Sequence, residues 1–256
     1  MSRSLCLLPA LVLCLSAVSL AGAESELTYP QLVQRITDLE RLALLPEEGE
    51  KGAQCSSYDR ASKYDANTGK YIAWDANGDG GGIIRREGEQ VVMAEMEGPG
   101  CIWRIWSAKA DAGHVRIFLD GAAEPAVDLP FKDYFSGKVE PFTRPTLVHD
   151  ASSGKNAYIP IPYQKSCKVV ADKGWGNYYH FTYSTFPKGT KVPTFKLPLS
   201  TEDNAALDAA EKTAANSGGV PAGGEGADKV VVNVDGGQVL KAAELKGPGA
   251  VTSIRA

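Results

Sequence analysis

The stretch MAEMEGPGCIWRIWSA, from Met93 to Ala108, decides the fold of this chain. Hydrophobic residues alternate with others before its Gly-Pro-Gly and again after it, which is the period-two pattern of β-strands. A shorter echo, AAELKGPGAVTSIRA, ends at Ala256, and Glu244 lies 149 positions after Glu95. The repeat predicts that the chain carries one β-domain and the start of a second.

Strand-like alternation continues across residues 47–199. It is clear in HVRIFLD, KSCKVVAD and NYYHFTYSTF, and Gly, Pro and Asp residues separate these runs. In the last run Tyr179 and Phe181 share one face, while His180 and Thr182 share the other. Many short strands with turns between them predict a mainly β fold, a β-sandwich of jelly-roll type.

An N-terminal helix is expected within residues 24–46. Thr28 and Gln31 form a capping-box pattern, and Pro30 is tolerated in the first turn. Pro46 ends a pattern of apolar residues at helical spacing: Leu32, Val33, Ile36, Leu39 and Leu42. The sequence therefore predicts one helix that packs a face on the domain that follows.

The pattern changes after Leu199. Residues 200–228 combine a stretch suited to a short helix, TEDNAALDAAEKTAAN, with a Gly-rich linker, SGGVPAGGEGAD. Residues 229–256 resume strand-like alternation but are too few to bury a core of their own. We therefore expect the truncated start of a second jelly roll. The alternative is that this tail adds edge strands to the first domain.

Residues 1–23 have the pattern of a cleavable signal peptide. Arg3 precedes an apolar run from Leu5 to Leu20, and Ala21-Gly22-Ala23 supplies the small residues of a cleavage site. The run is too short and too poorly flanked for a stable membrane span. We expect a secreted or periplasmic protein with no membrane association after signal removal.

Three cysteines follow the signal peptide: Cys55, Cys101 and Cys167. No Cys-x-x-Cys spacing suggests zinc. Cys101 and Cys167 lie in strand-like runs, where cysteine usually acts as a small buried hydrophobe. Burial is therefore favoured for these two, while the pairing of the three stays open.

Composition and motifs argue against several function classes. The net charge of −4 gives no electrostatic reason to expect a nucleic-acid partner. His114, His149 and His180 form no recognisable catalytic triad, and no Gly-x-Ser-x-Gly occurs. The Gly-rich segments lack the Lys-Ser/Thr ending of a phosphate loop. We expect neither a serine hydrolase nor a nucleotide-binding protein, and no cofactor.

A long polar and aromatic loop, from Cys55 to Glu89, is the candidate substrate-binding region. Aromatic faces stack on the C–H surfaces of sugars, while carboxylates and arginine bind hydroxyl groups. The candidate sugar-binding residues are Ser57, Tyr58, Asp59, Arg60, Trp74 and Asp75. The alternative is that Asp59 and Arg60 form a pair that only pins the loop.

The same loop contains the start of a calcium-binding pattern, with Asp75, Asn77 and Asp79 at alternate positions. The full pattern requires a final Glu, and Arg86 occupies that position. A turn held by Asx hydrogen bonds is favoured, so no metal site is predicted.

Several motifs in order resemble one family. They are SSYDR, MEGPGCIWRIW, VRIFLDG, PFKDYFSG, YIPIPYQKSCKV, YYHFTY and FPKGTKVPTF, which span Cys55 to Leu199. The chain resembles the domain of unknown function 2961 family, grouped with glycoside hydrolase family 172. The resemblance implies two tandem jelly rolls, assembly as trimers or multiples of trimers, and activity on α-fructofuranosides or α-D-arabinofuranosides. It also implies a retaining mechanism with two Glu residues, the general logic of glycosidases.

The departures from the family pattern concern catalysis. The family's Gly-Glu-Gly-Asp and Gly-Thr-Glu-Asp-Tyr-Phe stretches are missing, and Lys132 stands where the first-roll counterpart would have the acid. The second-roll counterpart would fall beyond Ala256, so the catalytic residues are unknown and we expect this chain alone to be inactive. The alternative is a non-catalytic carbohydrate-binding or scaffolding jelly roll.

Overall fold

The computed structural model describes residues 26–216, residues 230–247 and Val251. The helices of this part are α1 (Tyr29–Gln34), η1 (Glu40–Ala43), η2 (Phe131–Tyr134) and α2 (Thr201–Ala215). Its strands are β1 (Lys51–Ser56), β2 (Lys63–Asp65), β3 (Lys70–Ile72), β4 (Arg85–Glu87), β5 (Gln90–Glu97), β6 (Gly100–Ser107), β7 (His114–Leu119), β8 (Val127–Pro130), β9 (Val148–Ala151), β10 (Gly154–Ala157), β11 (Ile161–Tyr163), β12 (Ser166–Asp172) and β13 (His180–Thr185).

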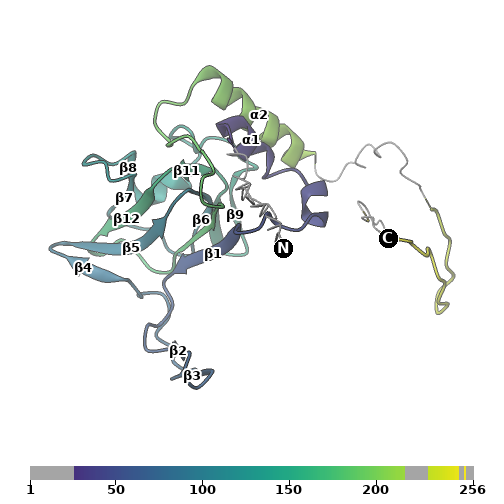
Figure 1. Cartoon of the computed structure of the whole chain (residues 1–256), viewed down its shortest axis with the longest axis horizontal. Helices are drawn as coiled ribbons and strands as arrows, with labels where there is room; N and C mark the ends of the chain where they lie inside the picture. Colours follow the sequence, from purple (N-terminus) through teal and green to yellow (C-terminus); the bar gives the residue numbers. More distant parts are fainter. Residues whose placement is uncertain (1–25, 217–229, 248–250, 252–256) are drawn as a thin grey trace, which may run out of the picture.

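The strands form a sandwich of two antiparallel sheets (Figure 1). One sheet has the order β1-β13-β6-β10-β9, with β11 also paired to β6, and the other has the order β4-β5-β12-β7-β8. The pairings are nested, since β1 pairs with β13, β5 with β12, β6 with β11 and β7 with β8. A long hairpin rolled up in this way is a jelly roll. The predicted fold class is confirmed.

The Met93–Ala108 stretch crosses from one sheet to the other. Its first five residues lie in β5 of the five-stranded sheet, and the part from Gly100 to Ser107 is β6 of the six-stranded sheet. Two of its glycines leave no space for a side chain: a Cβ on Gly98 would lie 2.7 Å from the carbonyl oxygen of Gln164, and one on Gly100 would lie 2.5 Å from Tyr163 Oη. The Gly-Pro-Gly is therefore where the backbone fits tightly between the two layers.

The core lies between the two sheets. In β7 every second residue is buried, as the alternation predicts for a strand with one solvent-facing side. Burial of each large apolar side chain stabilises the fold by about 1.5–3 kcal/mol. The largest fully buried side chains include Tyr134, Tyr163, Tyr179, Phe131, Phe142, Phe181, Met93, Ile102, Ile105 and Ile117.

The cysteines agree with the expectation of burial. Cys101 and Cys167 are buried, Cys55 is partly exposed, and all three are free thiols. Burial raises the pKa of the Cys101 thiol well above its ordinary value. These residues pack as small hydrophobes.

The N-terminal helix is shorter than predicted. The capping box of Thr28 and Gln31 is present, but α1 ends at Gln34. Asp38 then accepts a hydrogen bond from the backbone N–H of Arg41 at 3.1 Å, which starts the separate turn η1. Leu39 and Leu42, expected on the buried face, are exposed as a result. The prediction of one continuous helix through residue 46 is therefore wrong.

Helix α2 packs on the sandwich, and its buried residues are part of the same core. Ser200 caps it by accepting a hydrogen bond from the Asp203 N–H, and Leu207 and Ala210 are buried. It lies beside α1 at one end of the sheets (Figure 1). No helix among the described residues is long and apolar enough to cross a membrane.

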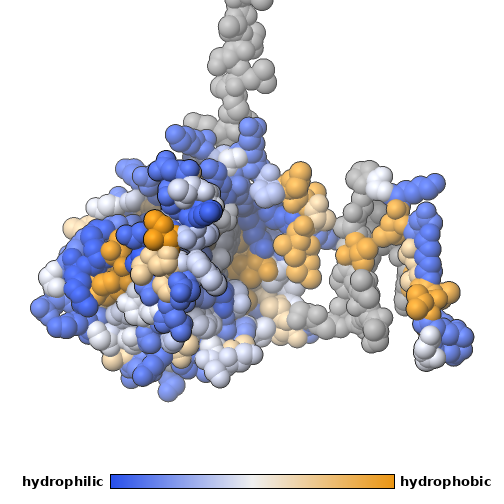
Figure 2. All heavy atoms as spheres, turned by 90° about the horizontal axis from the view of Figure 1, so that it is seen from below, coloured by the Kyte–Doolittle hydropathy of each residue, from blue (hydrophilic) through white to orange (hydrophobic). Residues whose placement is uncertain are grey.

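The C-terminal segment differs from its prediction. Residues 230–247 form no strand, and their valines and leucines are exposed (Figure 2). An isolated strand leaves its backbone N–H and C=O groups without partners, so alternation alone does not make one. The predicted strands of the second jelly roll are therefore not formed in these residues, nor does the segment add edge strands to the sandwich. The predicted signal peptide and the Gly-rich linker SGGVPAGGEGAD lie outside the described residues.

Candidate functional site

The candidate site is the arm, which we define as residues 57–82. The arm leaves the sandwich after β1, carries the hairpin of β2 and β3, and projects away from both sheets (Figure 1). The chain returns to the sandwich shortly before β4. The arm contains all six predicted sugar-binding residues.

Ser57 holds the base of the arm. Its side chain is 3% exposed, and Oγ accepts a hydrogen bond from the Tyr179 N–H at 3.2 Å. Its carbonyl oxygen accepts hydrogen bonds from the N–H groups of Gly80 at 2.9 Å and Gly82 at 3.2 Å. A Cβ on Gly82 would lie 2.0 Å from the carbonyl oxygen of Tyr58. Ser57 is therefore an anchor that brings the two ends of the arm together.

The partner of Ser57 is itself fixed in the core. Tyr179 donates a hydrogen bond from Oη to the Met93 carbonyl oxygen at 2.7 Å. Burial raises the pKa of Tyr179 to about 12, so the phenol keeps its proton at neutral pH. The arm is thus fastened to the strand-forming stretch with which the sequence analysis began.

Asp59 organises the interior of the arm. Its carboxylate accepts hydrogen bonds from the N–H groups of Ala61 at 2.9 Å and Gly78 at 2.8 Å. The Asp59 N–H donates in turn to Asp79 Oδ1 at 2.5 Å. Both carboxylates therefore bind backbone N–H groups within the arm.

Arg60 also binds within the arm. Nη1 donates to the Tyr58 carbonyl oxygen at 2.9 Å, and Nη2 donates to the Ser56 carbonyl oxygen at 3.0 Å. The guanidinium carbon lies 4.0 Å from the centre of the Tyr58 ring, a cation–π contact. Asp59 and Arg60 each pin the arm, but they do so through backbone groups and not as an ion pair.

The aromatic side chains of the arm face solvent. Tyr58 is 48% exposed and Trp74 is 79% exposed, and Asp75 next to Trp74 is exposed as well. Tyr64 and Tyr71, opposite each other in the hairpin, pack at 5.3 Å between ring centres and are also exposed. The sequence analysis did not select these two tyrosines, although their equal distances from the intervening turn are visible in the sequence.

The turn between β2 and β3 is held by Asp65. Its carboxylate accepts hydrogen bonds from the Asn67 N–H and from Thr68 Oγ1, both at 2.9 Å. The hydrogen bond from the Asn67 N–H is the main cause that lowers the pKa of this carboxyl group. The hairpin is thus a defined element that presents the tyrosine pair.

The calcium-like pattern at Asp75, Asn77 and Asp79 has another role. Asp79 is engaged with the Asp59 N–H. Within the part of the chain that the structure describes, no three His, Cys, Asp or Glu side chains are grouped to hold a metal ion. These residues belong to turns of the arm.

Tyr178 lies at the base of the arm and was also missed. Its N–H donates to the Gly80 carbonyl oxygen at 2.8 Å, and its carbonyl oxygen accepts from Ser107 Oγ at 2.7 Å. Its φ of 60° is the left-handed conformation, which costs free energy for a residue with a side chain. This conformation leaves a partly exposed phenol ring beside the arm.

The predicted counterpart of a catalytic stretch carries no acid in the required place. Phe131 and Tyr134 of η2 are buried, and Tyr134 Oη donates to the Val115 carbonyl oxygen at 2.9 Å. Lys132, between them, is exposed and has no carboxyl group. This segment is therefore part of the core.

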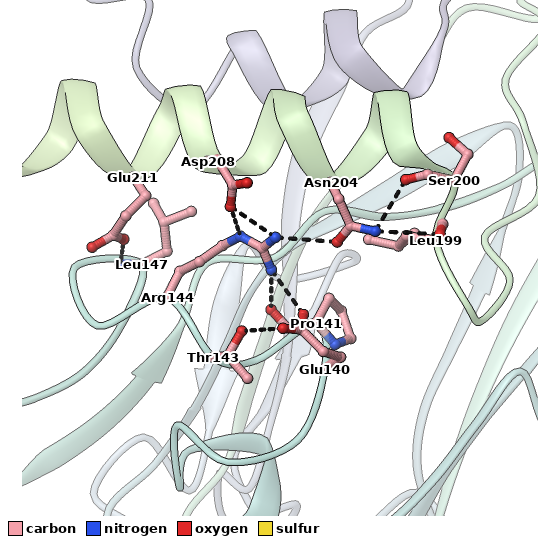
Figure 3. A network of polar contacts seen from close by, with 10 residues as sticks. All are labelled: Glu140, Pro141, Thr143, Arg144, Leu147, Leu199, Ser200, Asn204, Asp208 and Glu211. Atoms are coloured by element: carbon pink, nitrogen blue, oxygen red, sulfur yellow. Dashed lines mark hydrogen bonds and ion pairs between the residues drawn. The ribbon is translucent and has the colours of Figure 1, made fainter.

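A second polar cluster surrounds Arg144, which is 7% exposed (Figure 3). Nε donates to Asp208 at 2.9 Å, Nη1 to Glu140 at 3.0 Å and to the Pro141 carbonyl oxygen at 3.1 Å, and Nη2 to Asn204 at 3.1 Å. Every guanidinium nitrogen is thus occupied. The cluster fastens α2 to the sandwich and leaves no free group of Arg144 for a ligand.

The family model described as the GH172 first beta-sandwich domain matches residues 48–203. No curated protein matches the chain. The matched part runs from just before β1 into α2, and it includes the whole arm.

Proposed function

This chain belongs to the GH172 family, a glycoside hydrolase-like family, and we propose that it is an exported carbohydrate-active protein that binds furanosides through the arm. The observation that carries this proposal is the group of exposed rings on one rigidly anchored segment: Tyr58, Tyr64, Tyr71 and Trp74. Aromatic rings of this kind stack on the apolar faces of sugars. Asp75 beside Trp74 supplies an exposed acceptor for a hydroxyl group.

Roles within the arm divide by exposure. Trp74, Tyr58 and Asp75 contact the sugar, together with Tyr178 at the base. Ser57, Asp59 and Arg60 hold the arm in shape, because their polar atoms are engaged with backbone groups. The six residues predicted from the sequence thus serve two purposes, three as contacts and three as supports.

Catalysis is assigned to groups outside the arm. A glycosidase of the usual kind requires two carboxyl groups about 5–10 Å apart on either side of the bond that breaks. Asp59 and Asp79 are occupied by backbone N–H groups. In this proposal the first domain binds sugar through its arm. The two catalytic Glu residues belong to the second domain that the family resemblance implies. The protein works as a homo-oligomer such as a trimer.

The export part of the proposal rests on the sequence of residues 1–23. Cell fractionation of the native host with an antibody against the sandwich tests it. We expect the protein in the culture medium or periplasm, and recovery in the cytoplasm alone would contradict it.

Affinity electrophoresis tests the binding proposal. The full chain is run in native gels that contain arabinan, fructan or a pyranose polymer such as dextran. We expect retardation by one of the furanose polymers and free migration in dextran. Equal migration in all gels would overturn the proposal.

A scaffolding role is the second candidate, because Ile72, Tyr64 and Tyr71 are exposed at the tip of the projecting hairpin. In that role the tip packs against a sister subunit. Light scattering separates the two functions, since substitution of Tyr64 and Tyr71 by Ser lowers the mass of the assembly only if the tip is a subunit contact.

A further inference from the structure

The outer face of the six-stranded sheet carries a row of directly opposed residues. The register aligns Ser56 of β1 with His180 of β13, then with Trp106 of β6, Asn156 of β10 and His149 of β9. The row crosses five strands, roughly 19 Å at about 4.8 Å per strand. It faces away from the core, because the neighbouring Phe181, Ile105, Ala157 and Val148 are the buried residues of these strands.

Within the described part of the chain, α1 covers one end of this face. Leu32 of α1 packs there with Cys101, Phe186 and Val192, and Trp103 contacts the same cluster. At the other end, His149, Tyr158, Trp106 and His180 remain partly exposed. We call these four residues together with Arg104 the platform.

The platform has two stacked ring pairs. The Trp106 and His180 rings lie 4.5 Å apart and 29° from parallel, and the His149 and Tyr158 rings lie 6.0 Å apart and 22° from parallel. Gly154 makes room for the first pair, since a Cβ at Gly154 would lie 2.3 Å from Trp106 Nε1. The Trp106 indole therefore packs directly against the backbone of Gly154, where any other residue would place its side chain in the ring.

Arg104 lies between the two ring pairs. Its guanidinium carbon is 5.9 Å from the ring centre of Trp106 and 5.9 Å from that of Tyr158. Nε donates to Asn156 Oδ1 at 3.0 Å, and the Asn156 amide donates in turn to the His149 and Gly154 carbonyl oxygens. Asn156 is buried, so it is a positioning residue that sets the direction of the guanidinium.

The two terminal nitrogens of Arg104 have no partner among the residues that the structure describes. Neither Nη1 nor Nη2 donates a hydrogen bond to a described residue, and no described carboxylate pairs with Arg104. By contrast, Arg116 on the outer face of the other sheet binds both Asp128 and Asp172. Burial and the charge of Arg104 lower the pKa of His180, so His180 adds no charge at neutral pH.

We infer that the platform binds a saccharide that carries a carboxylate, such as a uronic acid residue, on the outer face of the six-stranded sheet. The planar fork of Nη1 and Nη2 matches the two oxygens of a carboxylate. The flanking rings match the apolar faces of the same and adjacent sugars. A neutral sugar would leave the positive charge of Arg104 without a partner, which is why the ligand is acidic.

Calorimetry with the full chain tests this inference without any substitution. The probes are a galacturonate oligosaccharide and a neutral galactose oligosaccharide of equal length. We expect binding of the acidic probe only, with affinity that falls as salt is added. Equal affinity for both probes, or no binding of the acidic probe, would overturn the inference.

Three variants locate the site. Arg104→Gln removes the charge and should weaken binding of the acidic probe at least about tenfold, because charged hydrogen bonds are lost. Arg104→Lys keeps the charge without the fork and should give a smaller loss. Arg116→Gln is the matched control and should leave the affinity unchanged. Unchanged affinity in folded Arg104→Gln would show that the platform is not the site.

Separate variants test furanoside binding by the arm and acidic-saccharide binding by the platform, so one proposal can be wrong while the other is right. Substitution of Trp74 on the arm should not change the affinity for the acidic probe, and Arg104→Gln should not change migration in furanose polymers. The inference therefore stands or falls independently of the arm.

Discussion

Arg144 and Asp208 lie 64 residues apart in the chain, yet Arg144 Nε donates a hydrogen bond to Asp208 Oδ1 at 2.9 Å. Glu211, one turn further along α2, accepts a hydrogen bond from the N–H group of Thr146 and another from that of Leu147. Figure 3 shows Glu211 beside Leu147. Together these contacts fasten α2 to the loop before β9. The compact unit therefore extends beyond the last strand to the end of α2.

The first prediction concerns this contact. Arg144→Ala should lower the free energy of unfolding by about 2–3 kcal/mol, since several hydrogen bonds of a buried charge are lost together. Urea denaturation measures the change. Arg86→Ala, at an exposed arginine of β4, is the control and should change stability by less than about 0.5 kcal/mol. Equal effects of the two substitutions would mean that α2 is not held by Arg144.

The second prediction concerns Gly82. Gly82→Ala should destabilise the base of the arm by about 2 kcal/mol or more, because its Cβ would meet the Tyr58 carbonyl oxygen at 2.0 Å. Gly52→Ala in β1 is the matched control, since no atom lies within 4 Å of the added Cβ. Thermal unfolding of both variants gives the comparison. A Gly82→Ala protein as stable as the Gly52→Ala protein would contradict the described base of the arm.

The third prediction concerns pH and Asp120. Burial by itself would raise the pKa of this carboxyl group, but hydrogen bonds from Thr194 Oγ1 and from the N–H groups of Lys165, Ser166 and Gln164 outweigh it and lower the pKa. A carboxyl group with a lowered pKa in the folded state stabilises the fold above its unfolded pKa, near 4. That stability is lost as the pH falls through the folded-state value.

Asp120→Asn should therefore be less stable than wild type at pH 7, by about 1–3 kcal/mol. The difference in the free energy of unfolding should narrow below about pH 4, where the Asp120 carboxylate of the unfolded state becomes protonated, and should keep falling towards the lower pKa of the folded state. Urea denaturation at pH 7, 5 and 3 tests this. If the difference in the free energy of unfolding between wild type and Asp120→Asn stayed constant down to pH 3, the charge of Asp120 would not contribute to stability.

The fourth prediction separates supports from contacts in the arm. Asp59→Ala should lower the melting temperature or increase proteolysis within the arm, because Gly78 and Ala61 lose their acceptor. Asp59→Ala should weaken sugar binding only because the arm loses its structure. If Asp59→Ala weakened binding while proteolysis and melting stayed as in wild type, Asp59 would be a direct contact.

Local features of this fold are visible in the sequence, whereas the contacts between distant segments are not. The capping box at Thr28, the alternation in β7 and the burial of Cys101 follow from neighbouring residue types. The end of α1 at Gln34 was missed, because Asp38 forms its own local hydrogen bond. Residues 230–247 alternate like a strand but form none, because a hydrophobic pattern does not provide a second strand to pair with.

The candidate site shows the same limit. Composition identified the arm, but not which of its polar residues face inward. Asp59 and Asp79 bind backbone N–H groups about twenty positions away, and such pairing depends on the path of the loop. The alignment of Trp106 with His180 depends on strand register, which is set by the packing of both sheets. Arg104 was missed for the same reason.

The central claim, that the exposed rings of the arm bind furanosides, is tested most directly by calorimetry of the full chain with arabinan and fructan oligosaccharides. Wild type should bind one of them, and Trp74→Ala should bind at least about fivefold more weakly with an unchanged melting temperature, as loss of a stacking ring implies. Leu45→Ala, at an exposed hydrophobic residue outside the arm, is the control. Full affinity in folded Trp74→Ala, Tyr58→Ala and Tyr178→Ala variants would contradict the claim.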